Sequence, residues 1–311
     1  MTYDQMRLDY LDPQKRKWQL QGPDQNAHPA VLLRKPMGLQ GAPISVERRK
    51  VLRSRDSFRV DTTIESREIE MTVELAADTP SEMYKLLQRW HDAWPENDEE
   101  PYADEAPTFG TLVSTAPGGQ VRKLDVYRTE VMETLSPMDP LVALKARYLM
   151  VCSSDDPYPY GDTVRGSGSL AAGGNTVFTL TNKGEVPVSP KLTIDAGASD
   201  VTVSARASLG GATKTLTQFS MAMKARGTFD LDPNVMTFTY EGDVFPITYW
   251  WKLRPVGERI EAGTVKPIAP PWGQNADLVL PPGKAVNFTV KSSKAGSYKW
   301  EFTPRYRRFM F

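Results

Sequence analysis

The stretch Tyr298–Thr303, with the sequence YKWEFT, alternates aromatic and polar residues without interruption. Because successive side chains of a β-strand point to opposite faces, this pattern gives one aromatic face and one polar face. Similar short runs, separated by Gly, Pro, Asn and Asp, occur at Val177–Leu180, Leu192–Ile194, Val201–Val203 and Thr237–Tyr240. The residues from Gly166 to Phe311 therefore predict one all-β sandwich.

The first half of the chain predicts a mixed α+β part. Ile69–Leu75 alternates apolar and polar residues, which is typical of a half-buried strand. A helix is expected over Pro80–Trp94, with Thr79 as N-cap and Glu82 closing a capping box. Its apolar stripe has the spacing of a helix that lies on a sheet and consists of Met83, Leu86, Leu87, Trp90 and Trp94. Further strands are expected around Phe109–Val113 and Arg122–Met132, and Leu141–Val151 fits either a strand or a helix.

A segment rich in Pro, Gly, Ser and Asp separates the two parts of the chain. The length of 311 residues fits two domains. The sequence therefore predicts a first domain at 1–155, a linker at 156–174 and a second domain at 175–311.

Composition limits the classes of function. The 38 basic and 38 acidic residues give a formal net charge of zero, which argues against attraction to nucleic acid or a membrane surface by bulk charge. A single cysteine, Cys152, and two histidines leave no disulfide and no thiolate zinc site, so we expect no metal and no cofactor. The N-terminal residues lack the apolar region of a signal peptide, and no apolar run is long enough to span a membrane.

Catalytic motifs are also missing from the sequence. It contains no G-x-S-x-G, no P-loop and no H-E-x-x-H. Paired carboxylates of a glycoside hydrolase could come from Asp230, Asp232, Glu241 or Asp243, but strand edges and turns explain these residues equally well. We expect that the protein is not an enzyme.

Two charged segments are candidate subunit interfaces. The basic residues between Arg48 and Arg59 predict an extended, exposed hairpin or loop, and Glu96–Glu105 predicts a charged loop without the spacing of a calcium site. A head-to-tail ring needs two unlike, complementary patches, although both segments can equally be solvated. The proposed contact joins Arg48, Arg49, Lys50, Arg53 and Arg55 of one copy to Glu99, Glu100, Asp104 and Glu105 of the next, or of a docked tube.

Three tryptophans, Trp250, Trp251 and Trp272, are candidate contacts for a glycan or a partner. Because Trp250 and Trp251 are adjacent, a strand would point them to opposite faces, and one would lie outside the core. The alternative is that these aromatic residues are core residues.

Several short motifs together carry a family resemblance. REIEMTVEL precedes the expected helix, DPYPYG occupies Asp156–Gly161, and PRYRRF lies near the end of the chain. The segments FTLTNKGEVPVSPKLTIDAG and LVLPPGKAVNFTV contain Asn182, Gly184 and Pro190, and Leu280, Pro282, Gly283 and Asn287. With these motifs the chain resembles the distal tail proteins, or minor tail proteins, of long-tailed non-contractile bacteriophages. It departs from them in having no glycine from Ala42 to Phe109.

The resemblance implies a mainly β fold with an α+β first domain. That domain would be a tail-tube-like β-sandwich or split barrel with one flanking helix, arranged as a hexameric ring. A galectin-like or carbohydrate-module-like β-sandwich would follow. The implied role is a virion protein at the tail tip, made in the host cytoplasm. It would join the tail tube protein to tip, tape-measure and adhesion proteins, with DNA only in transit through its channel.

Two other functions stay open. One is a carbohydrate-binding protein whose second domain recognises a host-surface glycan, and the other is a glycan-cleaving enzyme.

Overall fold

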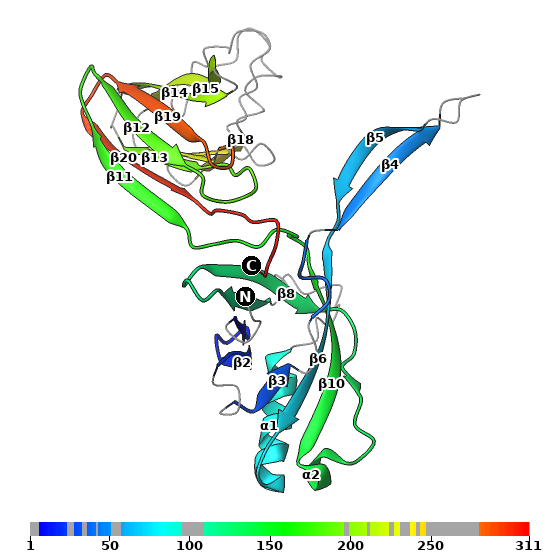
Figure 1. Ribbon diagram of the computed structural model, residues 1–311. Coiled ribbons are helices and arrows are strands. Elements are labelled where there is room, and N and C mark those ends of the chain that lie inside the picture. Colours follow the sequence, from blue (N-terminus) through cyan, green and yellow to red (C-terminus); the bar gives the residue numbers. More distant parts are fainter. Residues whose placement is uncertain are drawn as a thin grey trace. The chain divides into compact units, whose positions relative to one another are not determined.

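The computed structural model divides into two compact units (Figure 1). Unit 1 comprises Met1–Gly161 and Tyr306–Phe311, and unit 2 comprises Asp162–Arg305. The structure describes residues 6–23, 28–32, 36–41, 43–50, 57–94, 109–195, 199–209, 212–223, 227–230, 237–240, 243–246 and 280–310.

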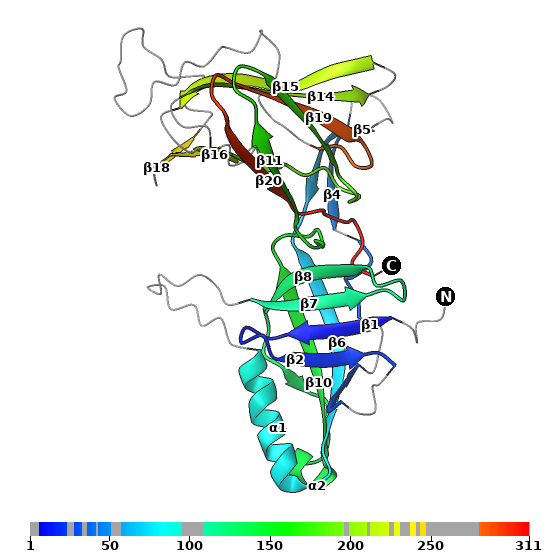
Figure 2. The same ribbon diagram turned by 90° about the vertical axis from the view of Figure 1, so that its left-hand side faces the viewer.

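Unit 1 is built on one curved sheet with the strand order β2-β1-β7-β8-β10-β6-β3, and β9 pairs with β10. The strands are β1 (Arg7–Leu11), β2 (Lys17–Gln21), β3 (Ala30–Leu32), β6 (Arg67–Ala76), β7 (Gly110–Thr115), β8 (Val121–Arg128), β9 (Glu133–Thr134) and β10 (Lys145–Ser154). Figure 2 shows β1, β2, β7 and β8 running across β6 and β10. The two parts are joined where Tyr127 and Arg128 of β8 pair with β10, and β2 and β3 approach one another, so the sheet is nearly closed.

Helix α1 (Pro80–Ala93) covers the inner face of this sheet and begins where the sequence predicts. The Thr79 hydroxyl accepts from the Glu82 N–H at 3.2 Å and donates to the Glu82 carboxylate at 3.0 Å. Of the predicted stripe, four residues are buried, namely Met83, Leu86, Trp90 and Trp94. Leu87 is only partly buried, because it lies at the margin of the stripe, whereas Ala93 is fully buried.

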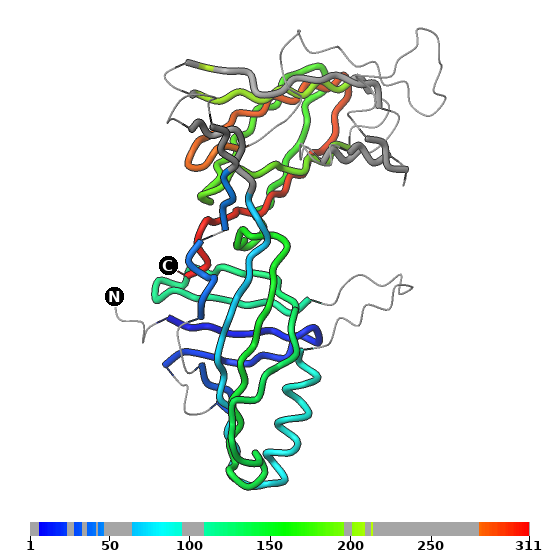
Figure 3. The backbone as a smooth tube through the Cα atoms, turned by 90° about the vertical axis from the view of Figure 1, so that its right-hand side faces the viewer, coloured from blue at the N-terminus to red at the C-terminus, as the bar shows by residue number. Residues whose placement is uncertain are grey.

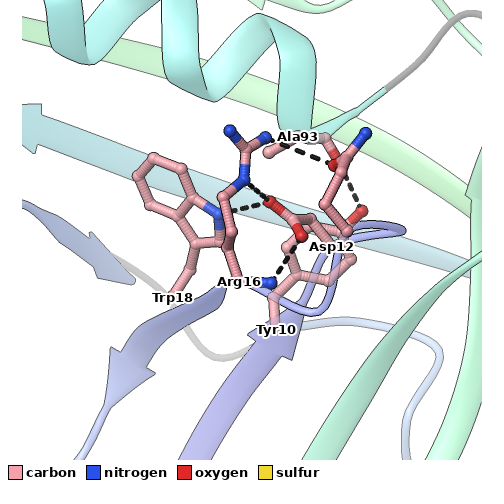
Figure 4. Close-up of polar contacts among 6 residues, drawn as sticks. Tyr10, Asp12, Arg16, Trp18 and Ala93 are labelled. Carbon is pink, nitrogen blue, oxygen red and sulfur yellow. Dashed lines mark hydrogen bonds and ion pairs between the residues drawn. The ribbon is translucent and has the colours of Figure 1, made fainter.

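Aromatic residues join the end of α1 to strands β1 and β2. The rings of Tyr10 and Trp94 stack with centroids 3.8 Å apart, and those of Trp18 and Trp90 meet edge to face at 5.1 Å. The Tyr10 hydroxyl donates to the Ala93 carbonyl at 2.7 Å, as Figure 4 shows. These contacts attach the C-terminal part of α1 to β1 and β2.

The turn between β1 and β2 is organised by Asp12, whose side chain is fully buried. Its carboxylate accepts from the backbone N–H of Arg16 at 2.7 Å, from the Arg16 guanidinium and from the Trp18 indole at 3.5 Å (Figure 4). Lys15 completes the turn with a φ of 65°. The turn thereby places Trp18 against α1.

The segment that fitted either a helix or a strand contains both. Helix α2 (Pro140–Ala143) has four residues and ends at Leu144, which has a left-handed φ of 53°. Strand β10 then pairs with β6 over all ten of its residues. Before β6, strands β4 (Ile44–Lys50) and β5 (Ser57–Ile64) form a separate two-stranded hairpin, which is one of the two predicted forms of this segment.

Unit 2 is a sandwich of two antiparallel sheets. One has the order β11-β20-β13-β16-β17-β18, and the other has the order β12-β19-β14-β15. The strands are β11 (Val164–Leu170), β12 (Asn175–Thr181), β13 (Lys191–Asp195), β14 (Ser199–Leu209), β15 (Ala212–Met223), β16 (Gly227–Asp230), β17 (Thr237–Tyr240), β18 (Asp243–Pro246), β19 (Ala285–Ser292) and β20 (Gly296–Phe302).

The core of unit 2 confirms the alternation in β20. Tyr298 and Phe302 are buried, Trp300 packs at the margin of the core, and Lys299 is exposed. Phe178 of the other sheet stacks on Tyr298, with ring centroids 4.4 Å apart. The mainly β fold expected from the sequence is therefore confirmed.

The last residues of the chain complete unit 1, although the expected second domain extended to residue 311. Phe309 and Met310 are buried in the unit 1 core, and the Phe309 N–H donates to the Leu39 carbonyl at 3.2 Å. The Arg122 guanidinium donates to the Arg308 carbonyl at 2.8 Å and lies over the Tyr306 ring at 4.5 Å. Figure 3 shows this red segment ending beside the strands of unit 1.

Burial along α1 predicts unequal costs for two neighbouring substitutions. We expect Leu86→Ala to lower the free energy of unfolding by about 2–5 kcal/mol, the range for truncating a buried leucine. Leu87→Ala should cost less, because Leu87 is only partly buried. Urea unfolding followed by tryptophan fluorescence measures both values. An unchanged midpoint for Leu86→Ala would show that this helix face is not core.

The C-terminal segment predicts a second stability effect. Phe309→Ala should destabilise unit 1 by about 3–5 kcal/mol, because it removes a fully buried aromatic ring. Arg308→Ala is the matched control, since the contact of Arg308 with Arg122 uses only its backbone carbonyl. In calorimetry, Phe309→Ala should lower the midpoint temperature of the unit 1 transition and leave that of the unit 2 transition unchanged. Val290→Ala identifies the unit 2 transition, because Val290 is buried in the core of unit 2. Equal effects of Phe309→Ala and Arg308→Ala would contradict the packing.

Candidate functional site

The structure describes only part of the predicted interface. Arg48, Arg49 and Lys50 are the last residues of β4, and their backbones pair with Arg59, Phe58 and Ser57 of β5. The side chains of these residues lie outside the described part of the structure. The other predicted residues lie wholly outside it, namely Arg53, Arg55, Glu99, Glu100, Asp104, Glu105, Trp250, Trp251 and Trp272. Their roles therefore stay predictions.

The hairpin presents an apolar stripe that sequence reasoning missed. Ile44 is 64% exposed, and its cross-strand neighbour Ile64 and the next residue on the same face, Val46, are also exposed. The signal was present in the alternation of Ile44, Ser45 and Val46. Among the described strands, β4 and β5 pair only with each other, so both outer edges of the hairpin have open backbone groups.

The four strands β2-β1-β7-β8 form one continuous run of the unit 1 sheet, with β2 and β8 at its two ends. Within the described residues, β2 pairs only with β1. At the other side, β8 pairs with β10 only through Tyr127 and Arg128, and Lys123 forms one isolated bridge with Tyr160. The two ends of this run are therefore different strands, with different side chains.

The face of these strands that points away from the core is polar, and some of its charges are paired. The Asp9 carboxylate lies 2.8 Å from Arg7 Nε and 3.2 Å from Lys17 Nζ. Burial beneath these side chains raises the pKa of Asp9, against the opposite effect of the Arg7 hydrogen bond. The negative charge of Asp9 is therefore balanced by the neighbouring cations Arg7 and Lys17.

A second polar cluster on β7 and β8 holds the chain where it leaves unit 1. The Asp125 carboxylate accepts from the Thr111 hydroxyl at 2.9 Å and from the Tyr160 hydroxyl at 2.8 Å. Burial, followed by the hydrogen bond to Asp125, raises the pKa of Tyr160 above its ordinary value. Tyr160 thus remains a neutral hydrogen-bond donor at physiological pH and ties the Asp156–Gly161 motif to β8.

Two motifs quoted for the family resemblance meet in unit 2. The buried Asn182 amide donates to the carbonyls of Val186 and Leu280 at 2.8 and 3.1 Å, and its side-chain oxygen accepts from the Gly184 N–H at 2.8 Å. A Cβ at Gly184 would come within 2.5 Å of the Arg305 carbonyl oxygen, so the residue must be glycine. These contacts give the motif residues a structural role.

A groove of about 440 Å³ lies on the outer face of β11, β20 and β13. Among the residues that line it, Glu301 pairs with Arg165 Nε at 3.0 Å and has Lys191 as its cross-strand neighbour. The next row places Lys299 beside Ser167. Among described side chains, neither Lys191 nor Lys299 forms an ion pair. The groove can therefore offer hydroxyl and ammonium donors to a polar ligand.

Searches for a metal site and for membrane-spanning helices cover the described residues only. Among these, no group of three or more His, Cys, Asp or Glu side chains could hold a metal ion. No helix in the same residues is long and apolar enough to cross a membrane. Of the carboxylates considered for catalysis, Asp230 and Asp243 lie on β16 and β18, while Asp232 and Glu241 are outside the described residues.

Comparison with known proteins gives matches among solved structures only. No protein-family model matches the sequence, and no curated protein matches it. The Dit protein of phage SPP1, described as a paradigm of the hub adsorption apparatus in phages that infect Gram-positive bacteria, aligns with a TM-score of 0.56 and 11% identity. The alignment covers 97% of this chain and 99% of that one.

A second match is a chain of the phage p2 baseplate in its activated conformation with strontium. It aligns with a TM-score of 0.46 and 9% identity, over 95% of this chain and 98% of that one. The likeness to the SPP1 protein shows that the chain has the fold of a Dit protein, and it shows the fold alone.

Proposed function

We propose that this chain is a structural protein of a bacteriophage tail tip. It forms a hexameric ring at the distal end of the tail tube and joins the tube to tip, tape-measure and host-adhesion proteins. The observation that carries this proposal is the alignment with the SPP1 Dit protein over nearly the full length of both chains. Because the alignment covers both units, it supports a shared role better than a match to one common sandwich would.

Ring closure requires two different surfaces on each copy, because a head-to-tail contact is heterologous. The strands β2 and β8, at the two ends of the run β2-β1-β7-β8, are our candidates for such a pair. In the proposed ring, β2 of one copy lies beside β8 of the next, so that the sheets of neighbouring copies surround a common axis. The polar face around Asp9 then lines a channel, and its paired charges let DNA pass without strong binding.

Charged segments would set the orientation of neighbouring copies. The basic residues Arg48–Arg55 and the acidic residues Glu99–Glu105 remain the proposed pair. Exposed ion pairs contribute only about 0–1 kcal/mol each, so the strand edges would provide most of the affinity. We therefore propose that the protein has an assembly role and no catalytic turnover.

The groove on unit 2 favours one second candidate function, which is glycan binding. Its hydroxyl and ammonium groups can donate to sugar hydroxyl or carboxylate oxygens. This function is compatible with a ring at the tail tip, because it uses a different unit of the chain. It also stands as the alternative if no ring forms.

The ring proposal predicts a native mass about six times the chain mass of 34.7 kDa. Arg53→Glu with Arg55→Glu should lower this mass in light scattering, and adding Glu99→Lys with Glu100→Lys should partly restore it. The control is Lys183→Glu with Lys284→Glu, two exposed lysines of unit 2. An unchanged mass for the first variant contradicts the charge pairing, and a monomeric parent contradicts the ring.

The glycan alternative predicts that the full chain binds members of an array of neutral and anionic glycans. Lys191→Ala with Lys299→Ala should weaken binding at least about tenfold, through the loss of two charged donors. Lys294→Ala, outside the groove, is the control. The glycans should be recovered uncleaved. Equal binding by both variants would exclude the groove, and cleavage that disappears on Asp230→Asn would contradict a non-catalytic role.

A further inference from the structure

Unit 1 consists of two chain segments, and unit 2 lies between them in the sequence. The second segment follows Arg305, and we call residues 306–310 the strap. Phe309 and Met310 of the strap are buried in the unit 1 core. This core is therefore complete only when a segment that follows unit 2 in the chain is docked on unit 1 (Figure 3).

Backbone hydrogen bonds fix the two ends of the strap. The Tyr306 N–H donates to the Pro159 carbonyl at 2.8 Å. The Phe309 N–H donates to the Leu39 carbonyl at 3.2 Å. Pro159 lies just before the chain leaves unit 1 at Gly161, so the first of these bonds joins the exit of the chain to its return.

Two largely buried arginine side chains bind the middle of the strap. The Arg67 guanidinium donates to the Arg307 carbonyl at 3.4 Å. The Arg122 guanidinium donates to the Arg308 carbonyl at 2.8 Å. Undocking takes one acceptor from each of these charged groups, and a buried charge is costly without acceptors. Docking of the strap therefore stabilises both arginines in their buried positions.

Unit 2 brings its own two ends together. Its first and last strands, β11 and β20, pair with Val164 opposite Phe302. One step beyond this pair, the hydroxyl oxygens of Thr163 and Thr303 are 3.0 Å apart. Folded unit 2 thus holds the residues that precede it and the residues that follow it close together in space.

The cost of docking the strap depends on the length of the loop that docking closes. With unit 2 unfolded, this loop has roughly 140 residues, whereas folded unit 2 leaves only about five residues outside its paired ends. The entropic cost of closure rises as three halves of the logarithm of loop length. The docking equilibrium of the strap should therefore differ on the order of a hundredfold between the two states.

We infer that folding of unit 2 stabilises the docked strap of unit 1, because folded unit 2 holds the two ends of the intervening loop together. This coupling goes beyond the proposed role at the tail tip, since it acts within a single copy of the chain. Linkage makes it reciprocal, so a docked strap favours folded unit 2 by the same factor. A copy whose unit 2 is unfolded leaves the unit 1 core open more often than a fully folded copy does.

Hydrogen exchange of the full chain, followed by mass spectrometry, measures docking of the strap. The amides of Tyr306 and Phe309 are protected while their bonds to the first segment of unit 1 are formed. Phe288→Asp places a charge in the unit 2 core, where Phe288 is fully buried, and should unfold unit 2. Loss of protection in β19, with protection retained in β6 and β10, identifies this state. Protection of the two strap amides should then fall on the order of a hundredfold.

Asn287→Asp is the matched control, because it places the same charge on the exposed face of β19. It should leave unit 2 folded and change the protection of the strap amides less than about twofold. Unchanged protection of the strap in Phe288→Asp, with β19 unprotected, overturns the inference.

A disulfide separates the holding of the two ends from every other effect of unfolding unit 2. Thr163→Cys with Thr303→Cys can form one, because opposed residues of antiparallel strands have Cα atoms about 4.5–5.5 Å apart. Cys152 does not compete, since it is buried and burial raises the pKa of its thiol to about 12.

The oxidised and reduced forms of this pair are compared in the Phe288→Asp chain, at a urea concentration at which β19 stays unprotected in both. The oxidised form should regain the protection of the strap amides, because the disulfide shortens the loop as folded unit 2 does. The reduced form should stay as weakly protected as Phe288→Asp alone. Equal protection of the two forms would show that the strap does not depend on the paired ends of unit 2.

Discussion

The guanidinium of Arg67 joins three chain segments at the point where β6 begins. The residue has no exposed surface, and it donates to the carbonyls of Gly38, Pro157 and Arg307 at 3.3, 2.7 and 3.4 Å. Burial lowers the pKa of Arg67 to about 10, so the group stays charged at neutral pH. Removing the guanidinium would take one hydrogen-bond donor from each of these carbonyls, at about 1–3 kcal/mol for any carbonyl that is then buried and unpaired.

Each segment held by Arg67 has its own role in the chain. Gly38 lies in the loop that leads into the β4–β5 hairpin, Pro157 lies where the chain leaves unit 1, and Arg307 lies where it returns. A Cβ at Gly38 would come within 1.8 Å of the Glu68 carbonyl oxygen, and its φ is 80°, so glycine is required at this crossing. The root of the proposed assembly hairpin and both connections to unit 2 therefore depend on one side chain.

Local patterns in the sequence predicted much of the fold. The alternation in Ile69–Leu75 and Tyr298–Phe302 assigned their faces, and the cap at Thr79 placed the start of α1. The same reasoning left Leu141–Val151 open between helix and strand, because the four residues of α2 are too few to show a helical period. It also overestimated the burial of Leu87, since a stripe gives the direction of a side chain and not the width of the surface that covers it.

The candidate sites were less predictable than the fold. Charge clusters in the sequence pointed to the hairpin, but the apolar stripe of Ile44, Val46 and Ile64 gained meaning only from the exposure of that hairpin. The sequence by itself determined strand faces, turns and the helix start, since these depend on neighbouring residues. Only the tertiary structure decided that Arg67 binds a carbonyl 240 residues away and that Phe309 completes the first core, because burial depends on segments that are distant in the chain.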